Sequence, residues 1–152
     1  AAKVIATLAP GLIEAGIEIH ADPQASDLLR SAGLQSQALL TADLDREWLA
    51  LTMNIVVVAD VDAAIAHIAR HGSGHSEAIL GDDLGVAARF LQQVDAAAVY
   101  HNASTRFSDG GQFGMGVEVA VSTSRLHPRG PVGPAELTSV KWIGTGDYLA
   151  RR

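Results

Sequence analysis

The chain has 152 residues, of which 48% are hydrophobic and 18% are charged, with a mean hydropathy of +0.19. This is enough apolar material for one ordinary domain with a buried core, which excludes a wholly disordered protein. The net charge of −6 gives no basic surface for nucleic acid or anionic lipid, so the expected partner is a small molecule or another protein.

No apolar run approaches the roughly 18 residues of a membrane-spanning helix and no signal sequence is present, so we expect a cytoplasmic protein. Cysteine is absent, so these 152 residues cannot form a disulfide, a thiolate metal site or a thiol nucleophile.

The first third of the chain predicts two helices around a short strand. Apolar residues recur at helical spacing over residues 4–13, and a short alternating strand follows over residues 17–20. Pro10 lies inside the first helix and is expected to kink or restart it. A second helix is expected over residues 24–30. Residues 41–52 are ambiguous, with acidic side chains that favour a turn of helix.

The middle of the chain alternates strands with helices. Residues 54–59 are mostly β-branched without polar alternation, which predicts a strand that is covered on both faces and central in a sheet. Further strands are expected over residues 77–80 and 97–101, and helices over residues 61–70 and 86–94. The N-caps of these helices are expected to be Asp60 and either Asp82 or Asp83. The helix over residues 86–94 should turn Phe90 and Leu91 inward. Strands separated by helices of about ten residues are typical of βαβ units, so the predicted fold class is α/β with a parallel sheet.

The pattern changes after residue 116. An alternating strand is expected over residues 117–122, and a loop rich in proline and glycine over residues 127–134. A last strand should begin at Leu137 and end at Ile143. It has no obvious partner in the preceding βα units, so we expect it to pair outside its own domain. The predicted parts of the chain are residues 1–116 and residues 117–152.

The segment over residues 99–116, VYHNASTRFSDGGQFGMG, combines a strand-like start, a polar turn and a glycine-rich loop. Such a combination is typical of a substrate site at the end of a strand. Arg106 carries a planar cationic fork suited to carboxylate or phosphate, so the expected ligand is anionic. Glycine lets backbone N–H groups approach a ligand closely. Because the loop leads into a strand and not a helix, however, a pocket wall is favoured over a dinucleotide phosphate cradle.

Three histidines, His67, His71 and His75, are spaced four residues apart and would present imidazoles on one helical face. Gly72 ends the helix before the third histidine, and no glutamate completes an HExxH motif, so a metal site is not expected. The favoured interpretation is that His71 interacts with the negative end of its helix dipole. No GxSxG motif is present, so serine hydrolase chemistry is not supported either.

Three strings in the chain, DAAIAHIARHGSGHSEAIL, VYHNASTRFSDGGQFGMGVEVAVSTSRLHPRGPVG and ELTSVKW, closely resemble the C-terminal part of the gamma-glutamyl phosphate reductase family, within the aldehyde dehydrogenase superfamily. The resemblance covers nearly the whole chain from about Ile17 onward. It implies part of an aldehyde dehydrogenase-type catalytic domain with an oligomerisation strand. It also implies NADPH-dependent reduction of L-glutamyl 5-phosphate to L-glutamate 5-semialdehyde in proline biosynthesis.

In enzymes of this family a cysteine thiolate attacks the acyl phosphate, a thioester forms, and hydride from the nicotinamide reduces it. The resemblance places that cysteine just before the first residue of this chain. The chain alone is therefore expected to be inactive.

The resemblance also assigns site residues. Glu47, in the string DREWL, is similar to the glutamate that contacts the nicotinamide ribose, although its neighbours alone favour a plain surface carboxylate. Arg106 is expected to bind the glutamyl carboxylate or the phosphate. The other expected substrate-binding residues lie in the same loop: Asn102, Ser104, Thr105, Phe107, Gly110, Gly111 and Phe113. The strand from Leu137 to Ile143 resembles the family's oligomerisation arm, which implies a homodimer.

A second hypothesis stays open, from a different class of protein. The chain could be a non-catalytic ligand-binding or assembly module that keeps the fold without the chemistry. A cysteine-bearing segment encoded directly before Ala1 would favour the reductase, whereas a start codon at that point would favour the module.

Overall fold

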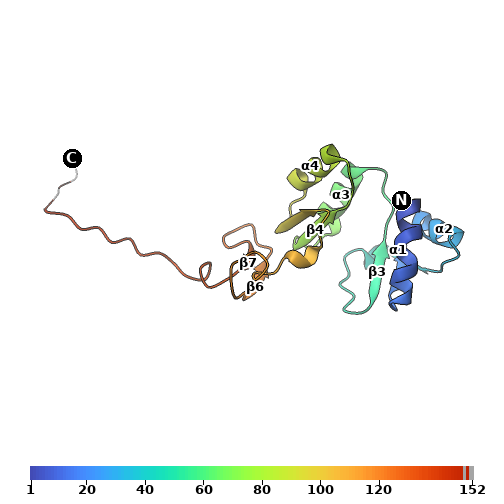
Figure 1. Cartoon of the computed structure of the whole chain (residues 1–152), viewed down its shortest axis with the longest axis horizontal. Helices are drawn as coiled ribbons and strands as arrows, with labels where there is room; N and C mark the ends of the chain where they lie inside the picture. Colours follow the sequence, from blue (N-terminus) through green and yellow to red (C-terminus); the bar gives the residue numbers. More distant parts are fainter. Residues whose placement is uncertain (149, 151–152) are drawn as a thin grey trace. The chain divides into compact units, whose positions relative to one another are not determined.

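The computed structural model describes residues 1–148 and 150 and has the predicted α/β class (Figure 1). It separates into two compact units, Ala1–Gly72 and Ser73–Arg152, here called the first and second units. The division predicted after residue 116 is a different one and stays a prediction. Within the described residues, no helix is both long and apolar enough to cross a membrane.

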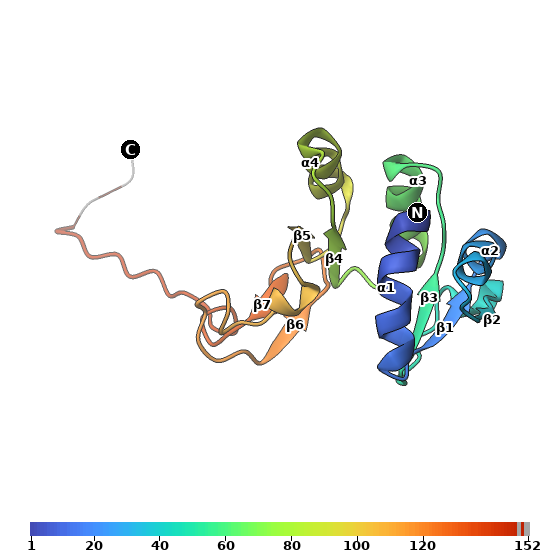
Figure 2. The ribbon, with the colours of Figure 1, turned by 45° about the vertical axis from the view of Figure 1, so that its right-hand side comes forward.

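The first unit contains a three-stranded parallel sheet. Its elements are α1 (Ala2–Glu14), β1 (Glu18–Ala21), α2 (Pro23–Ser31), β2 (Gln37–Ala38), the 3-10 helix η1 (Thr41–Asp43), β3 (Thr52–Ile55) and α3 (Val61–His71). The strand order is β2-β1-β3, with β1 paired in parallel on both sides (Figure 2). The core is formed by buried residues of α1, β1 and α2: Ile5, Ala9, Ile19, Ala21, Ala25 and Leu29.

Two predictions for the first unit are wrong. The central strand is β1, not the strand expected over residues 54–59, and β3 ends at Ile55. Beyond Ile55, the Val57 N–H donates to the Asp22 carboxylate at 3.2 Å and not to a neighbouring strand, so the strand pairing does not continue. The helix α1 continues through Pro10 without restarting, and the alternative that Pro10 kinks it stays a prediction. The ambiguous segment from residue 41 forms only the short η1 before a loop.

The second unit contains two separate two-stranded sheets. Its elements are β4 (Ser76–Ile79), α4 (Leu84–Gln93), β5 (Ala98–His101), the 3-10 helix η2 (Thr105–Phe107), β6 (Ala120–Ser122) and β7 (Gly130–Val132). Strands β4 and β5 are parallel, and β6 and β7 are antiparallel. The loop predicted over residues 127–134 therefore contains a strand. Its Pro131 lies opposite Val121, at an edge position that proline tolerates because it needs no N–H donor.

The predicted helix caps are confirmed. Asp60 accepts the N–H of Ala63, and Asp83 accepts the N–H groups of Gly85 and Val86. The inward placement of Leu91 is wrong, because this side chain is 40% exposed. The buried face of α4 and its C-cap consists instead of Ala87, Phe90 and Val94, which follow the helical spacing of three and four residues.

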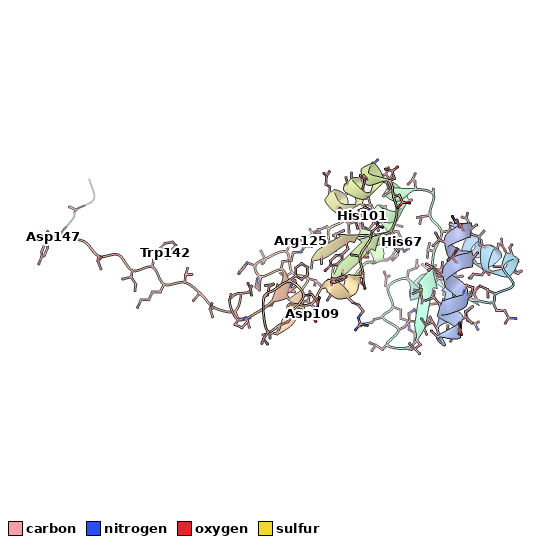
Figure 3. The ribbon with its side chains drawn as sticks, in the orientation of Figure 1. His67, His101, Asp109, Arg125, Trp142 and Asp147 are labelled. Atoms are coloured by element: carbon pink, nitrogen blue, oxygen red, sulfur yellow. The ribbon has the colours of Figure 1, made fainter. Side chains whose placement is uncertain are left out.

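The strand predicted from Leu137 to Ile143 does not form within the described residues, since this segment is assigned to no strand. Its apolar side chains are exposed: Val140 is 82% exposed, and Trp142, which is labelled in Figure 3, is 92% exposed. A strand requires a neighbouring strand as its hydrogen-bonding partner, and within residues 1–148 and 150 no strand pairs with this segment. Pairing with another copy stays a prediction.

Candidate functional site

The predicted substrate loop begins at the carboxyl end of β5, where Asn102 adopts the left-handed conformation with φ of 52°. The Asn102 amide is bonded on both sides to the Gly81 peptide: its Oδ1 accepts the Gly81 N–H at 2.9 Å and its Nδ2 donates to the Gly81 carbonyl at 3.0 Å. The His101 ring contacts the same carbonyl through Nε2 at 2.8 Å. Asn102 thus joins the ends of β4 and β5 and fixes where the loop starts.

The turn that follows presents Arg106. Ser104 caps η2, because its hydroxyl accepts the backbone N–H of Arg106 at 3.2 Å. Thr105, Arg106 and Phe107 are all exposed. None of the ion pairs within the described residues involves Arg106, so its guanidinium is available to an external anion.

The glycine-rich part of the loop is held by two carboxylates of its own. The Gly110 N–H donates to Glu118 Oε2 at 2.5 Å, and the Gly111 and Gln112 N–H groups donate to Asp109 Oδ1. The next three N–H groups donate to backbone carbonyls of the same loop. These N–H groups are occupied and aim at the protein, so they do not form an anion cradle.

The burial of Gly110 explains why this position is glycine. A Cβ here would lie 2.9 Å from the Cβ of Glu118, closer than side chains approach one another. Gly111 is restricted as well, since its Cβ would lie 3.0 Å from Asp109 Oδ1. The absence of a Cβ at these two glycines allows the loop to pack closely. Phe113 on the same loop is 51% exposed.

A chain of hydrogen bonds through Ser108, the residue after η2, was not predicted from the sequence. The Ser108 hydroxyl lies 2.8 Å from the Tyr100 hydroxyl and 2.5 Å from that of Ser76, which in turn lies 2.7 Å from His75 Nδ1. It connects β4 and β5 to the residue directly after η2. Neither β4 (SEAI) nor β5 (AVYH) has a polar periodicity that would have indicated these bonds, which join residues far apart in the sequence.

Glu47 belongs to the first unit, so its relation to the Arg106 turn stays a prediction. It is exposed on the loop after η1, next to the half-buried Trp48. The Trp48 indole donates to Asn54 Oδ1 at 3.0 Å, and the rings of Trp48 and His20 have centroids 4.4 Å apart. The Arg46 guanidinium covers Trp48 at 4.2 Å from the ring centroid. The neighbour of Glu47 is therefore firmly held, while the carboxylate itself faces solvent.

The three spaced histidines are only partly brought together. The rings of His67 and His71 have centroids 4.8 Å apart on α3, whereas His75 follows in the second unit. His71 Nδ1 lies 2.7 Å from Asp45 Oδ1, which is a more specific partner than the helix dipole. In the part of the chain that the structure describes, no three His, Asp or Glu side chains are grouped so as to hold a metal ion.

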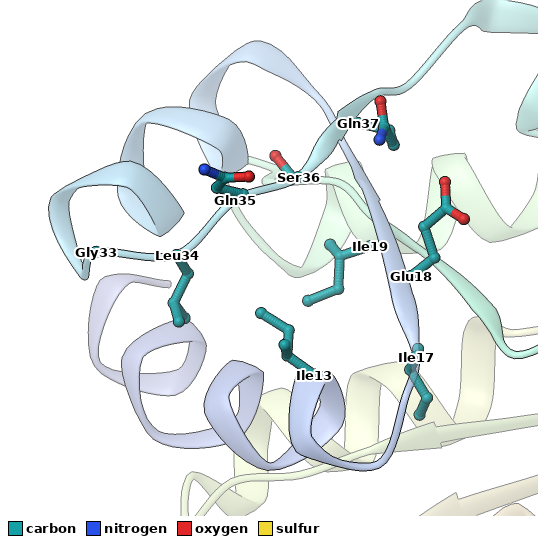
Figure 4. A pocket seen from close by; sticks show the side chains of 9 residues that line it. All are labelled: Ile13, Ile17, Glu18, Ile19, Gly33, Leu34, Gln35, Ser36 and Gln37. Carbon is teal, nitrogen blue, oxygen red and sulfur yellow. The ribbon is translucent and has the colours of Figure 1, made fainter.

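A cavity of about 400 Å³ opens in the first unit between the end of α1, β1 and residues 33–37 (Figure 4). Ile13, Ile19 and Leu34 point into it, and Glu18 lies at its side. None of the sequence-predicted site residues lines it. Four aliphatic and four polar side chains line it, and Glu18 is the titratable group of this lining.

Comparison with known proteins gives no matching family model. The chain is, however, 53% identical over 145 residues to the gamma-glutamyl phosphate reductase of Shewanella amazonensis, covering 95% of this chain and 34% of that protein. The gamma-glutamyl phosphate reductase of Escherichia coli O157:H7 is 51% identical over 144 residues, with the same coverage of 95% and 34%.

A crystal structure of gamma-glutamyl phosphate reductase from Thermotoga maritima superposes with a TM-score of 0.88 at 40% identity, over 97% of this chain and 36% of that one. The chain spans about a third of the length of these relatives.

Parallel strands joined by helices, with a polar turn at the carboxyl end of β5, define part of an α/β protein of the kind that binds ligands at strand ends. The similarity runs through nearly the whole chain and extends to the fold. Over nearly its whole length, this chain is similar to about a third of each of these gamma-glutamyl phosphate reductases.

Proposed function

We propose that this chain is part of an NADPH-dependent reductase that converts L-glutamyl 5-phosphate to L-glutamate 5-semialdehyde in proline biosynthesis, in the cytoplasm. The observation that carries the proposal is the identity of 53% over 95% of the chain to a protein named for this reaction. The exposed Arg106 turn supports it, because an anionic substrate needs a cationic partner at the site.

Arg106 is the residue proposed to bind the glutamyl carboxylate or the phosphate. Its guanidinium can donate two parallel hydrogen bonds to either group, which fixes orientation as well as charge. Ser104 and Asn102 would contribute mainly by holding the turn, because their side chains already bond to backbone groups. Thr105, Phe107 and Phe113 are exposed and could line the substrate beside Arg106.

Glu47 is proposed to accept hydrogen bonds from the nicotinamide ribose. The fit is reasonable, since this carboxylate is exposed and its loop is anchored through Trp48 to Asn54. NADPH would supply the hydride for the reduction. The contribution of this loop would be to present the Glu47 carboxylate from a backbone that Trp48 anchors.

The chain contains no cysteine, so the thiolate that the reaction requires is not among its 152 residues. Acyl transfer to a thiol would need a residue outside them. The residues present can bind and orient the substrate, and we propose that this is their share of the reaction.

The exposed segment from Leu137 to Ile143 is proposed to pair with a second copy and form a homodimer. Its side chains Val140, Trp142 and Ile143 are at least 78% exposed, which is costly for large apolar groups in water. A strand added to a partner's sheet would bury them and satisfy their backbone groups.

The proposal is tested by assaying NADPH oxidation with glutamyl phosphate. We expect the full-length protein that carries this segment to be active and the 152-residue chain alone to be inactive. Activity that requires both glutamyl phosphate and NADPH supports the proposal. A full-length protein without such activity, or a chain of 152 residues that has it, would contradict the proposal.

A further inference from the structure

The three parallel strands of the first unit end at one edge of their sheet, and a cavity of about 300 Å³ lies there. Asp22 directly follows β1, Leu39 and Leu40 follow β2, and Val56 follows β3, and all four line the cavity. The chain passes from β1 to β2 on one side of β1 and then returns to β3 on the other side. Open α/β sheets bind ligands at the carboxyl ends of their strands, at the point where the strand order reverses in this way.

The remaining wall of this cavity comes from the last turns of α3 and carries one arginine and two histidines. His67, Arg70 and His71 all line it, and the two imidazole rings are tilted by 48° to one another with their centroids 4.8 Å apart. Arg70 has no ion pair within the described residues, so its charge is not offset by a carboxylate.

The acidic side chains near this wall are already engaged. Asp22 accepts the N–H groups of Ala25 at 2.7 Å and Val57 at 3.2 Å, which spread its charge over the backbone. Asp45 is paired with His71 and is largely exposed. The opposite wall is apolar through Leu39, Leu40, Leu44 and Val56.

We propose that this cavity is a binding site for a small oxyanion that carries a short apolar body, such as an alkyl phosphate or an alkyl carboxylate. The anionic head would lie against Arg70 and His67, and the apolar body against the leucines and Val56. This site lies wholly in the first unit and shares no residue with the Arg106 turn, so it does not depend on the proposed reductase activity.

Protonation of His67 should control the binding. Its pKa is lowered below the ordinary value by burial and then by the positive charges of His71 and Arg70 on the same helix. Asp22 after β1 and Asp45 after η1 are the carboxylates on the elements facing these histidines. A bound anion favours the imidazolium and raises the pKa of His67, so binding takes up a proton. Affinity should therefore increase as the pH falls through the histidine range.

The experiment titrates the chain with inorganic phosphate, butyl phosphate and butyrate while following the imidazole resonances of His67 and His71 by NMR. We expect saturable shifts with a dissociation constant near 1 mM or weaker, about −4 kcal/mol. Butyl phosphate should bind more tightly than inorganic phosphate, because its alkyl group reaches the apolar wall. Comparison with butyrate distinguishes a phosphate site from a carboxylate site. The dissociation constant of butyrate, whose charge does not change in this range, should decrease about threefold or more between pH 8 and pH 6.

Two variants and a matched control decide the assignment. Arg70→Gln should weaken binding about fivefold or more, and His67→Gln should abolish the pH dependence of butyrate binding. Lys3→Gln removes the same charge from an exposed position of α1 outside the cavity and should leave binding unchanged. The backbone spectrum of each variant verifies its fold. Shifts that do not saturate, or equal weakening by Lys3→Gln and Arg70→Gln, would overturn the proposal.

Discussion

The two units of this chain are stabilised in different ways. The first unit buries a connected apolar cluster contributed by α1, β1 and α2, in which Ala25 and Leu29 are completely inaccessible to solvent. The second unit buries fewer apolar side chains and joins its short strands through side-chain hydrogen bonds, among them Asn102 to Gly81 and Tyr100 to Ser108. Apolar packing tolerates varied surroundings, whereas polar connections require particular residues at particular places.

This difference bears on the candidate substrate site. The loop that carries Arg106 belongs to the unit whose geometry is set by directional bonds, which hold a binding residue in one orientation. Substitutions in the two units should accordingly reduce stability for different physical reasons.

Leu29→Ala should have the largest effect on stability. Leu29 is 0% exposed, so the substitution leaves a cavity in the core of the first unit and should cost about 2–5 kcal/mol. Urea unfolding followed by Trp48 fluorescence in a Trp142→Phe background measures this loss. The control is Leu8→Ala on α1, which is 53% exposed and should cost less than about 0.5 kcal/mol. Equal losses would show that the first unit is not held by this core.

Gly110→Ala should have an intermediate effect, in the second unit. The added methyl would lie 2.9 Å from the Cβ of Glu118, so the loop must shift at a cost of about 1–3 kcal/mol. Gly144→Ala is the matched control, because nothing lies within 4 Å of a Cβ at that position. Thermal unfolding of the two variants gives the comparison, and equal midpoints would mean that the Gly110–Glu118 contact does not hold the loop.

Tyr100→Phe should have the smallest effect on stability, about 1 kcal/mol, because it removes one hydrogen bond to Ser108. Hydrogen exchange at the Asn102 amide, which donates to the Ile79 carbonyl, reports the loosening of β4 from β5. Tyr148→Phe removes the same hydroxyl from a fully exposed side chain and should not change this exchange rate. An Asn102 amide that exchanges equally in both variants would remove Tyr100 from the polar connections of the second unit.

Local signals predicted most helices and strands of the chain. Asp60 and Asp83 marked helix starts correctly, because a cap depends only on the next few residues. The position of β1 at the centre of its sheet was not predictable in this way, since strand order depends on contacts between distant segments. The same holds for β7, whose partner lies across a proline-rich loop.

The segment that forms the candidate site was predicted, but the hydrogen bonds that hold its loop were not. The string around Arg106 indicated the loop and its exposed cation. It did not show that the glycine N–H groups are taken up by Asp109 and Glu118, because those bonds depend on how the loop folds back on itself. The polar chain through Ser108 was missed for the same reason.

The central claim is that Arg106, and not a backbone cradle, binds the anionic substrate. The most direct measurement is kcat/KM for glutamyl phosphate in the full-length protein carrying Arg106→Ala, beside a control carrying Arg125→Ala. Arg125 is also an exposed arginine, but it is paired with Asp95 at 2.5 Å and lies outside the loop. We predict a loss of about tenfold or more for Arg106→Ala, equivalent to about 1.4 kcal/mol, and no change for Arg125→Ala. Unchanged kinetics in Arg106→Ala would contradict the account.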